Sequence, residues 1–302
     1  MKQHWVPRSY LSAWADQDTA QRQNPLVWAL NIGERRLFHP SVTNIFAETH
    51  MYSVVDQDGT KDISLENQLA GIEGDFAEAR NRFELGIKPA ADDESLFAAY
   101  AAVMHTRSRS MRDHQRGQWQ NMLDRMNEME KRYQDHGARG FSPVAQSSDP
   151  SKVITREDVE HMVTNTAAMI VPIFAQAESR IYSRMSRATL IAKGNETFIT
   201  SDQPCVWLDN EYQEPSFWQK SPLISKGLEV YLPISPRQCF VWSHTAELVG
   251  KIPVDDPIVR MMNLWIAAHA TILIKERPLF EKTYCDNPRI ARAVAGIYRR
   301  AF

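Results

Sequence analysis

The hydrophobic pattern of this 302-residue chain changes along its length, and that change limits the folds it can adopt. Between residues 65 and 83, apolar side chains recur at spacings of three and four, which is the period of an amphipathic helix. After residue 188 the apolar runs are short and turn sequences separate them, as expected of strands. Helices followed by clustered strands indicate an α+β fold. We predict long helices packed on a mostly antiparallel sheet that the C-terminal half largely forms.

The same patterns place the individual elements. The predicted helices cover roughly residues 64–83, 94–133 with an interruption at Gly117, 155–187, 256–275 and 288–300. Thr155 and Asp158 form a capping-box pattern at the start of the third helix. The predicted strands are 189–192, 197–200, 206–208, 228–234 and 238–242.

The chain length suits one large domain or two modest ones. Glycine and proline interrupt a serine-containing segment at 137–151, which is the best linker candidate. We predict a single domain over residues 1–302. The alternative is a subdivision into 1–136, with a turn-rich start and helices, and 152–302, with a helix, the sheet and the final helices.

Composition narrows the classes of partner. A formal net charge of -2 gives no overall attraction to nucleic acid, so such a partner would have to bind a local basic patch. The three cysteines include no C-x-x-C pair, which makes a thiolate zinc site unexpected and favours a reducing cytoplasm. The longest apolar stretches, 167–177 and 264–274, are too short to cross a bilayer, so we expect no membrane association.

Two motifs carry a resemblance to a known family. The chain opens with His4, Pro7, Tyr10-Leu11 and Trp14, and a later segment reads Thr-Ser201-Asp202-Gln-Pro. With these spacings the sequence resembles the bacterial family known as domain of unknown function 4238. Further landmarks that agree with the family in order are Tyr52, Glu66, Glu73, Arg107 and Asn263. The resemblance implies a shared set of positions, and it assigns no reaction.

The first motif residues suggest a polar site. His4 lies in a segment that apolar neighbours would hold against a core, where an imidazole serves as general base or metal ligand. Asp202 follows a predicted strand and would orient His4 or bind a cation through oxygen. The alternative for each is structural: a histidine bonded to backbone, and an Asx turn at Asp202. Ser201 is not expected to be a nucleophile, because no G-x-S-x-G motif surrounds it.

Other candidates lie on the predicted helices. Glu66 and Glu73 are seven residues apart, hence about 10 Å along one helical face and too distant to share one metal without a third group. Arg109 and His114 resemble the Arg-x4-His motif of small all-helical ribonucleases, although such pairs arise readily by chance. Solvent-exposed surface residues are the alternative interpretation of all four.

Two hypotheses follow. In the first, the protein is a hydrolase, most plausibly a phosphodiesterase or nuclease acting on RNA or DNA, with His4 as base, Asp202 as its orienting group and Arg107 as phosphate clamp. The supporting residues would be Tyr10, Glu66, Glu73, Ser201 and Asn263. A divalent ion, Mg²⁺ or Mn²⁺, is left open, zinc is not expected, and no motif for a nucleotide cofactor is present. In the second, the protein is a non-catalytic binding or scaffold protein. It would contact a protein partner through a Trp-rich loop, Trp207 to Trp218, and the charged half of the predicted helix 94–133.

Overall fold

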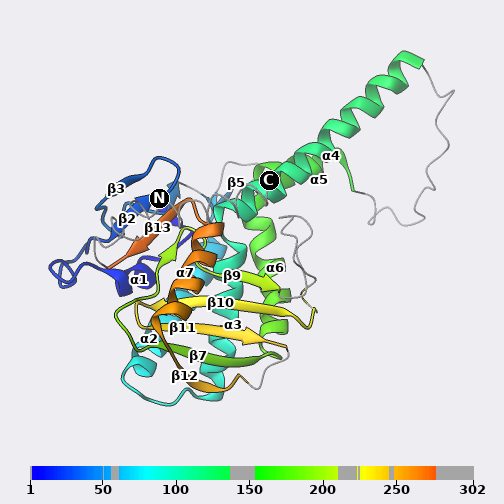
Figure 1. The fold of residues 1–302 in the computed structure, drawn as a ribbon. Coiled ribbons are helices and arrows are strands. Elements are labelled where there is room, and N and C mark those ends of the chain that lie inside the picture. The colour runs from blue at the N-terminus through cyan, green and yellow to red at the C-terminus, as the bar shows by residue number, and fades with distance from the viewer. Residues whose placement is uncertain are drawn as a thin grey trace.

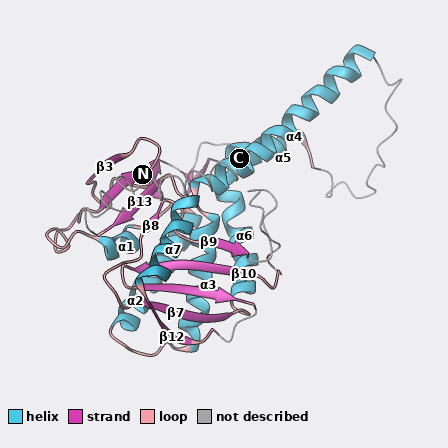
Figure 2. Ribbon diagram, in the orientation of Figure 1, coloured by secondary structure: helices cyan, strands magenta, loops and turns pink. Residues whose placement is uncertain are grey.

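The computed structural model describes residues 2–49, 51–55, 61–136, 154–209, 223, 225–244 and 248–276, and it confirms the predicted α+β class (Figures 1 and 2). The described helices are α1 (Arg8–Leu11), α2 (Ser64–Glu84), α3 (Ala91–Thr106), α4 (Arg109–His136), α5 (Arg156–Thr164), α6 (Thr166–Tyr182) and α7 (Asp256–His269). The predicted linker 137–151 and the predicted helix 288–300 lie outside the described residues.

Two sheets dominate the strands. The larger has the order β12-β7-β11-β10-β9, built from Gly250–Val254, Ser186–Ala192, Gln238–Ser243, Leu228–Ser235 and Val206–Asp209. The smaller has the order β3-β2-β13-β8, built from Arg36–Phe38, Trp28–Asn31, Ile272–Lys275 and Thr200–Ser201. Pairing is antiparallel in both sheets except between β12 and β7. Four shorter described strands form two pairs, β1 (Lys2–His4) with β4 (Ala47–Thr49) and β5 (Val54–Val55) with β6 (Lys61–Asp62).

Helices cover both faces of the larger sheet, because side chains alternate along its strands. On β11, Phe240 and Trp242 join the core formed with α2, α3 and α6. Cys239 and Val241 point to the opposite face and pack with α7, which crosses the front of the sheet in Figure 1. The strands are therefore apolar on both faces, and their sequences show continuous apolar runs.

The longest helix, α4, extends away from the rest of the molecule with α5 beside it (Figure 1). This position explains the sequence of its second half, in which charged side chains and methionines alternate without a fully buried stripe. The capping box predicted at Thr155 is present at the start of α5, where Thr155 and Asp158 each bond the other's backbone N–H.

Three predicted boundaries differ from the structure. The second predicted helix is divided at Arg107–Ser108, and Gly117 lies inside the continuous helix α4. The third ends at Tyr182, with a break at Asn165 between α5 and α6. The helix predicted over 256–275 ends at His269, because the following residues pair with β2 and β8 as strand β13. None of the described helices has the length and apolar character needed to cross a membrane.

The N-terminal segment is attached to the C-terminal sheets by buried hydrogen bonds. The Tyr10 hydroxyl donates to the Pro233 carbonyl at 2.6 Å and lies 2.9 Å from the Thr200 hydroxyl. The Trp14 indole N–H donates to the Phe198 carbonyl at 2.8 Å. Burial raises the pKa of Tyr10 well above its usual value, so it remains a neutral donor.

We expect Tyr10→Phe to lower the free energy of unfolding by about 1–2 kcal/mol, because it leaves the buried Pro233 carbonyl without this donor. Tyr100→Phe is the matched control, since the Tyr100 hydroxyl is buried with no hydrogen-bond partner among the described residues. That control should be neutral or stabilising. Urea denaturation of both variants makes the comparison, and equal losses would contradict the assignment of the Tyr10 bonds as stabilising.

Candidate active site

An open cavity of about 730 Å³ lies where β1 and α1 face α2. Three segments that are distant in sequence contribute its ionisable side chains, which are Lys2, His4, Arg8, Glu66, Glu73 and Arg107. Three of these carry permanent positive charge and two are carboxylates. The cavity therefore gathers four of the residues that the sequence singled out.

One wall of the cavity is a single face of α2. Glu66, Ala70, Glu73 and Gly74 follow at i, i+4, i+7 and i+8, so the predicted placement of both carboxylates on one face is correct. Small residues between and beside the carboxylates leave room for the cavity. A Cβ atom built on Gly74 would meet nothing within 4 Å, and the same holds for Gly71, which does not line the cavity.

The Arg107 guanidinium lines the cavity and is almost completely buried. The Arg107 side chain is 2% exposed and donates to Glu73 Oε1 at 2.5 Å, to the His4 carbonyl and to the Tyr52 hydroxyl at 3.4 Å. Burial would lower the pKa of Arg107, but Tyr52 and Glu73 raise it above its ordinary value, so the group stays charged. It therefore joins β1, α2 and the α3–α4 corner through one buried cation.

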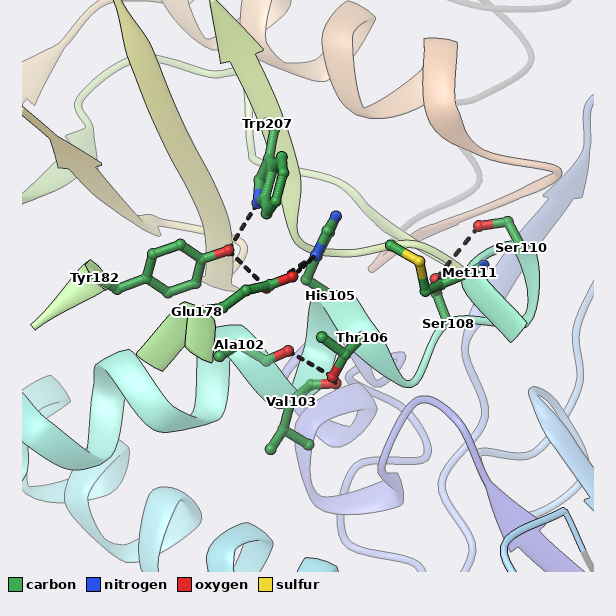
Figure 3. A network of polar contacts seen from close by, with 10 residues as sticks. All are labelled: Ala102, Val103, His105, Thr106, Ser108, Ser110, Met111, Glu178, Tyr182 and Trp207. Carbon is green, nitrogen blue, oxygen red and sulfur yellow. Dashed lines mark hydrogen bonds and ion pairs between the residues drawn. The ribbon is translucent and has the colours of Figure 1, made fainter. Parts of the chain in front are cut away.

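The backbone of that corner is fixed by local polar contacts, seen in Figure 3. The Thr106 hydroxyl donates to the Ala102 carbonyl at 2.9 Å, within the last turn of α3. The Ser108 hydroxyl accepts from the Met111 N–H at 3.3 Å, which is the geometry of an N-cap for α4. Arg107 is thus held between the end of one helix and the start of the next.

A buried network next to this corner was not predicted from the sequence (Figure 3). His105 Nδ1 lies 2.9 and 3.0 Å from the two Glu178 oxygens, and Tyr182 donates to Glu178 at 2.9 Å. The Trp207 indole N–H donates to the Tyr182 hydroxyl at 2.7 Å, and its ring stacks on His105. The network connects α3, α6 and β9, so it fixes the last turn of α3, from which Arg107 projects.

His4 has one fixed ring nitrogen and one open one. Its Nε2 lies 3.1 Å from the Thr43 carbonyl, which only accepts, so Nε2 carries a hydrogen. In the neutral ring Nδ1 is then the basic nitrogen, and within the described part of the chain it has no hydrogen-bond partner. Burial lowers the pKa of His4 below 6.5, and the nearby Arg8 and Arg107 act in the same direction.

Glu66 and Arg8 also have no internal partners among the described residues. Burial raises the pKa of Glu66 above 4.5; Arg107 opposes that rise and Glu73 adds to it. Arg8 is exposed at the rim, and neither a hydrogen bond nor an ion pair to the described residues engages its guanidinium. Arg8 was not among the sequence candidates, because a lone arginine after a proline has no distinguishing pattern.

The motif residues of the C-terminal half lie elsewhere. Asp202 does not line the cavity; its carboxylate accepts the N–H groups of Thr271 at 2.9 Å and Ile272 at 3.1 Å, at the start of β13. Burial raises the pKa of Asp202, and these backbone bonds oppose the rise. The Ser201 hydroxyl accepts from the Gln203 N–H at 3.0 Å. The structure therefore places both within a bonded turn, and their predicted roles in catalysis remain untested.

Asn263 and Tyr10, which were predicted to support the site, also form side-chain hydrogen bonds to backbone groups. The Asn263 side chain accepts from the Ile199 N–H at 3.0 Å and donates to the Thr197 carbonyl at 2.9 Å, which joins α7 to the segment before β8. Tyr10, described above, joins α1 to β10. Neither residue lines the cavity.

Arg109 and His114 lie on α4, away from the cavity lining. Arg109 is exposed and pairs loosely with Asp113, at 3.7 Å. His114 lines a separate depression of about 720 Å³ on α4, and Arg109 does not. Five residues along a helix place two side chains on different faces, so the structure does not bring this pair together.

No three His, Cys, Asp or Glu side chains gather as metal ligands within the described ranges. The chemistry that the cavity offers through its own residues is proton transfer and anion contact, because it combines a basic nitrogen, a carboxyl group of raised pKa and the unengaged guanidinium of Arg8.

The comparisons with known proteins place this α+β protein in a family. A family model described as "Protein of unknown function (DUF4238)" matches residues 2–278. The chain therefore belongs to this family, as the sequence resemblance predicted. No curated protein and no solved structure matches it.

We expect Asp202→Ala to lower the free energy of unfolding by about 1–3 kcal/mol, because two backbone N–H groups lose their acceptor. Asp202→Asn keeps an acceptor oxygen and should lose less. Denaturant titration measures both. An alanine variant as stable as the wild type would show that the turn does not depend on this carboxylate.

Proposed function

We propose that the protein is a hydrolase, a phosphodiesterase that cleaves RNA or DNA, with the cavity beside β1 as its active site. The observation that carries the proposal is the convergence of His4, Glu66, Glu73 and Arg107 in one open cavity. These residues come from segments that are distant in sequence. Active sites are usually concave and contain titratable groups with shifted pKa values.

The proposed roles follow from which atoms are engaged. His4 Nδ1 is the general base, and the Thr43 carbonyl holds the ring in the required tautomer. Arg8 and Lys2 contact phosphate oxygens at the rim, because neither is held by a carboxylate among the described residues. Arg107 positions the backbone of His4 and the Glu73 carboxylate, and it contributes positive potential to the cavity.

Two observations favour the binding or scaffold hypothesis. Tyr10, Asp202 and Asn263 are bonded to backbone groups, which is how structural staples behave. The arm formed by α4 and α5 carries exposed apolar side chains, Met129 and Ile154, that a protein partner could cover. Residues 210–218 of the predicted Trp-rich contact loop lie outside the described residues.

We also propose a cytoplasmic location, since Cys205 and Cys239 are buried in the core.

We expect His4→Gln to reduce cleavage by about 100-fold or more, the usual contribution of a general base. Glutamine retains an N–H that can donate to the Thr43 carbonyl, so the fold should persist. The wild-type rate should fall as the pH decreases through the His4 pKa, which lies below 6.5, and His4→Gln should lose this acidic limb. The assay uses transfer RNA, total RNA and single- and double-stranded DNA, with Mg²⁺, Mn²⁺ or EDTA.

The Arg109→Ala/His114→Ala double variant is the control for that assay, because the pair lies outside the cavity lining. Its activity should equal that of the wild type. Loss of cleavage in the double variant with retention in His4→Gln would move the site to α4. Absence of cleavage of every substrate by folded wild-type protein would overturn the proposed function and favour the binding hypothesis.

Gly74→Leu should block the cavity without unfolding α2. The new side chain starts from open space on the cavity wall, and replacing a mid-helix glycine adds about 0.5–1 kcal/mol of helix stability. Gly71→Leu is the matched control, one turn away on α2 and outside the cavity lining. We expect about tenfold or greater loss of cleavage for Gly74→Leu alone, with thermal unfolding showing both variants at least as stable as the wild type.

A further inference from the structure

We infer that the substrate of this site is RNA, and that the 2′-hydroxyl of the cleaved nucleotide is the nucleophile. The inference rests on the proposed phosphodiesterase function and makes its substrate class specific. It stands on the placement of a basic imidazole and a carboxyl group in one cavity, with Arg8 and Lys2 at the rim. His4 is the base for the nucleophile, and Glu66 is the acid for the leaving group.

The two groups are suited to opposite roles. His4 has an open Nδ1, and the groups facing its ring are the Thr43 carbonyl, Arg8, Glu73 and Arg107. Their combined effect with burial keeps the ring neutral to lower pH than usual. A neutral imidazole is the form that accepts a proton.

Glu66 has the complementary environment. It projects from α2 toward the same cavity and faces Glu73 and Arg107, without an internal hydrogen bond in the described part of the chain. Burial raises its pKa above 4.5, which increases the fraction of carboxylic acid. The two environments move the pKa values of His4 and Glu66 toward each other, which increases the fraction of molecules that hold a neutral His4 and a protonated Glu66 at the same time.

A nucleophile supplied by the substrate fits this set of residues. The 2′-hydroxyl is already adjacent to the phosphorus, so the enzyme needs only to remove its proton and align the bond that breaks. A water nucleophile would need additional groups to hold it. To accept the 2′-hydroxyl proton the cavity offers one open imidazole nitrogen, His4 Nδ1.

The proposed step balances without a further reactant. His4 Nδ1 takes the proton of the 2′-hydroxyl as the 2′-oxygen bonds to phosphorus. The bond between phosphorus and the 5′-oxygen breaks, and the Glu66 carboxyl gives its proton to that oxygen. The products are a 2′,3′-cyclic phosphate and a 5′-hydroxyl. Proton exchange with solvent then restores neutral His4 and protonated Glu66.

The first experiment locates the cleaved bond in an RNA oligonucleotide and replaces the 2′-hydroxyl at that nucleotide by hydrogen. We expect at least about 100-fold slower cleavage, because the nucleophile is removed and the charge of the strand is unchanged. Mass spectrometry of the RNA products should show a 2′,3′-cyclic phosphate. The same replacement one nucleotide away is the control and should have little effect.

The outcomes separate this inference from the proposed function. Equal cleavage of the substituted strand, or products with a 5′-phosphate, would overturn the RNA-specific step while leaving a phosphodiesterase. Cleavage of neither RNA nor DNA would overturn the proposed function itself, and the inference with it.

A second experiment tests the role of Glu66. We expect Glu66→Gln to slow RNA cleavage by about 100-fold and to remove the alkaline limb of the pH profile. On a substrate whose 5′-bridging oxygen is replaced by sulfur, the loss should be less than about tenfold, because a thiolate leaves without protonation. Asp75→Asn is the control, since this exposed carboxylate lies on α2 outside the cavity. Equal loss on both substrates would overturn the assignment of Glu66 as acid.

Discussion

A single buried cation, Arg107, organises the N-terminal part of this structure. Removing a guanidinium from water is costly, so it must meet acceptors that the fold brings to it. Those acceptors are Glu73 on α2, the backbone carbonyl of His4 on β1 and the Tyr52 hydroxyl. Loss of one partner from a buried ion pair costs about 3–5 kcal/mol, which is a large fraction of a domain's stability. The requirement to satisfy Arg107 therefore fixes β1 against α2, and the cavity is the space left between them.

The cavity differs from its supports in how its polar atoms are used. Arg107 is bonded to both Glu73 and Tyr52, whereas His4 Nδ1, Glu66 and Arg8 are not engaged by the described residues. Polar side chains without internal partners do not stabilise the fold. When several of them gather in one place, that place is often a functional site. A rigid frame with open groups at its surface is also what preorganised proton transfer requires.

Much of this arrangement could be predicted from local sequence, and the rest depends on contacts between distant segments. The three-to-four spacing along α2 placed Glu66 and Glu73 on one face correctly, and the capping box at Thr155 marked a helix start. The sequence does not predict the break at Arg107–Ser108, although the Ser108 hydroxyl caps α4 locally. The Arg107 side chain at this corner is held by partners far away in sequence. The sequence predicts helix at 272–275 for the same reason. These residues form a strand because they pair with β2. Arg8 had no pattern at all.

The family motifs contain two physically different kinds of residue, and sequence alone does not separate them. The side chains of Asp202 and Asn263 form hydrogen bonds to backbone groups. These bonds connect β13 and α7 to neighbouring segments. His4 uses one ring nitrogen in this way and leaves the other available. In a list of motif positions all three are polar residues at fixed spacing. The distinction is whether a side chain retains an unsatisfied atom facing a cavity, and that depends on the three-dimensional partner of each group.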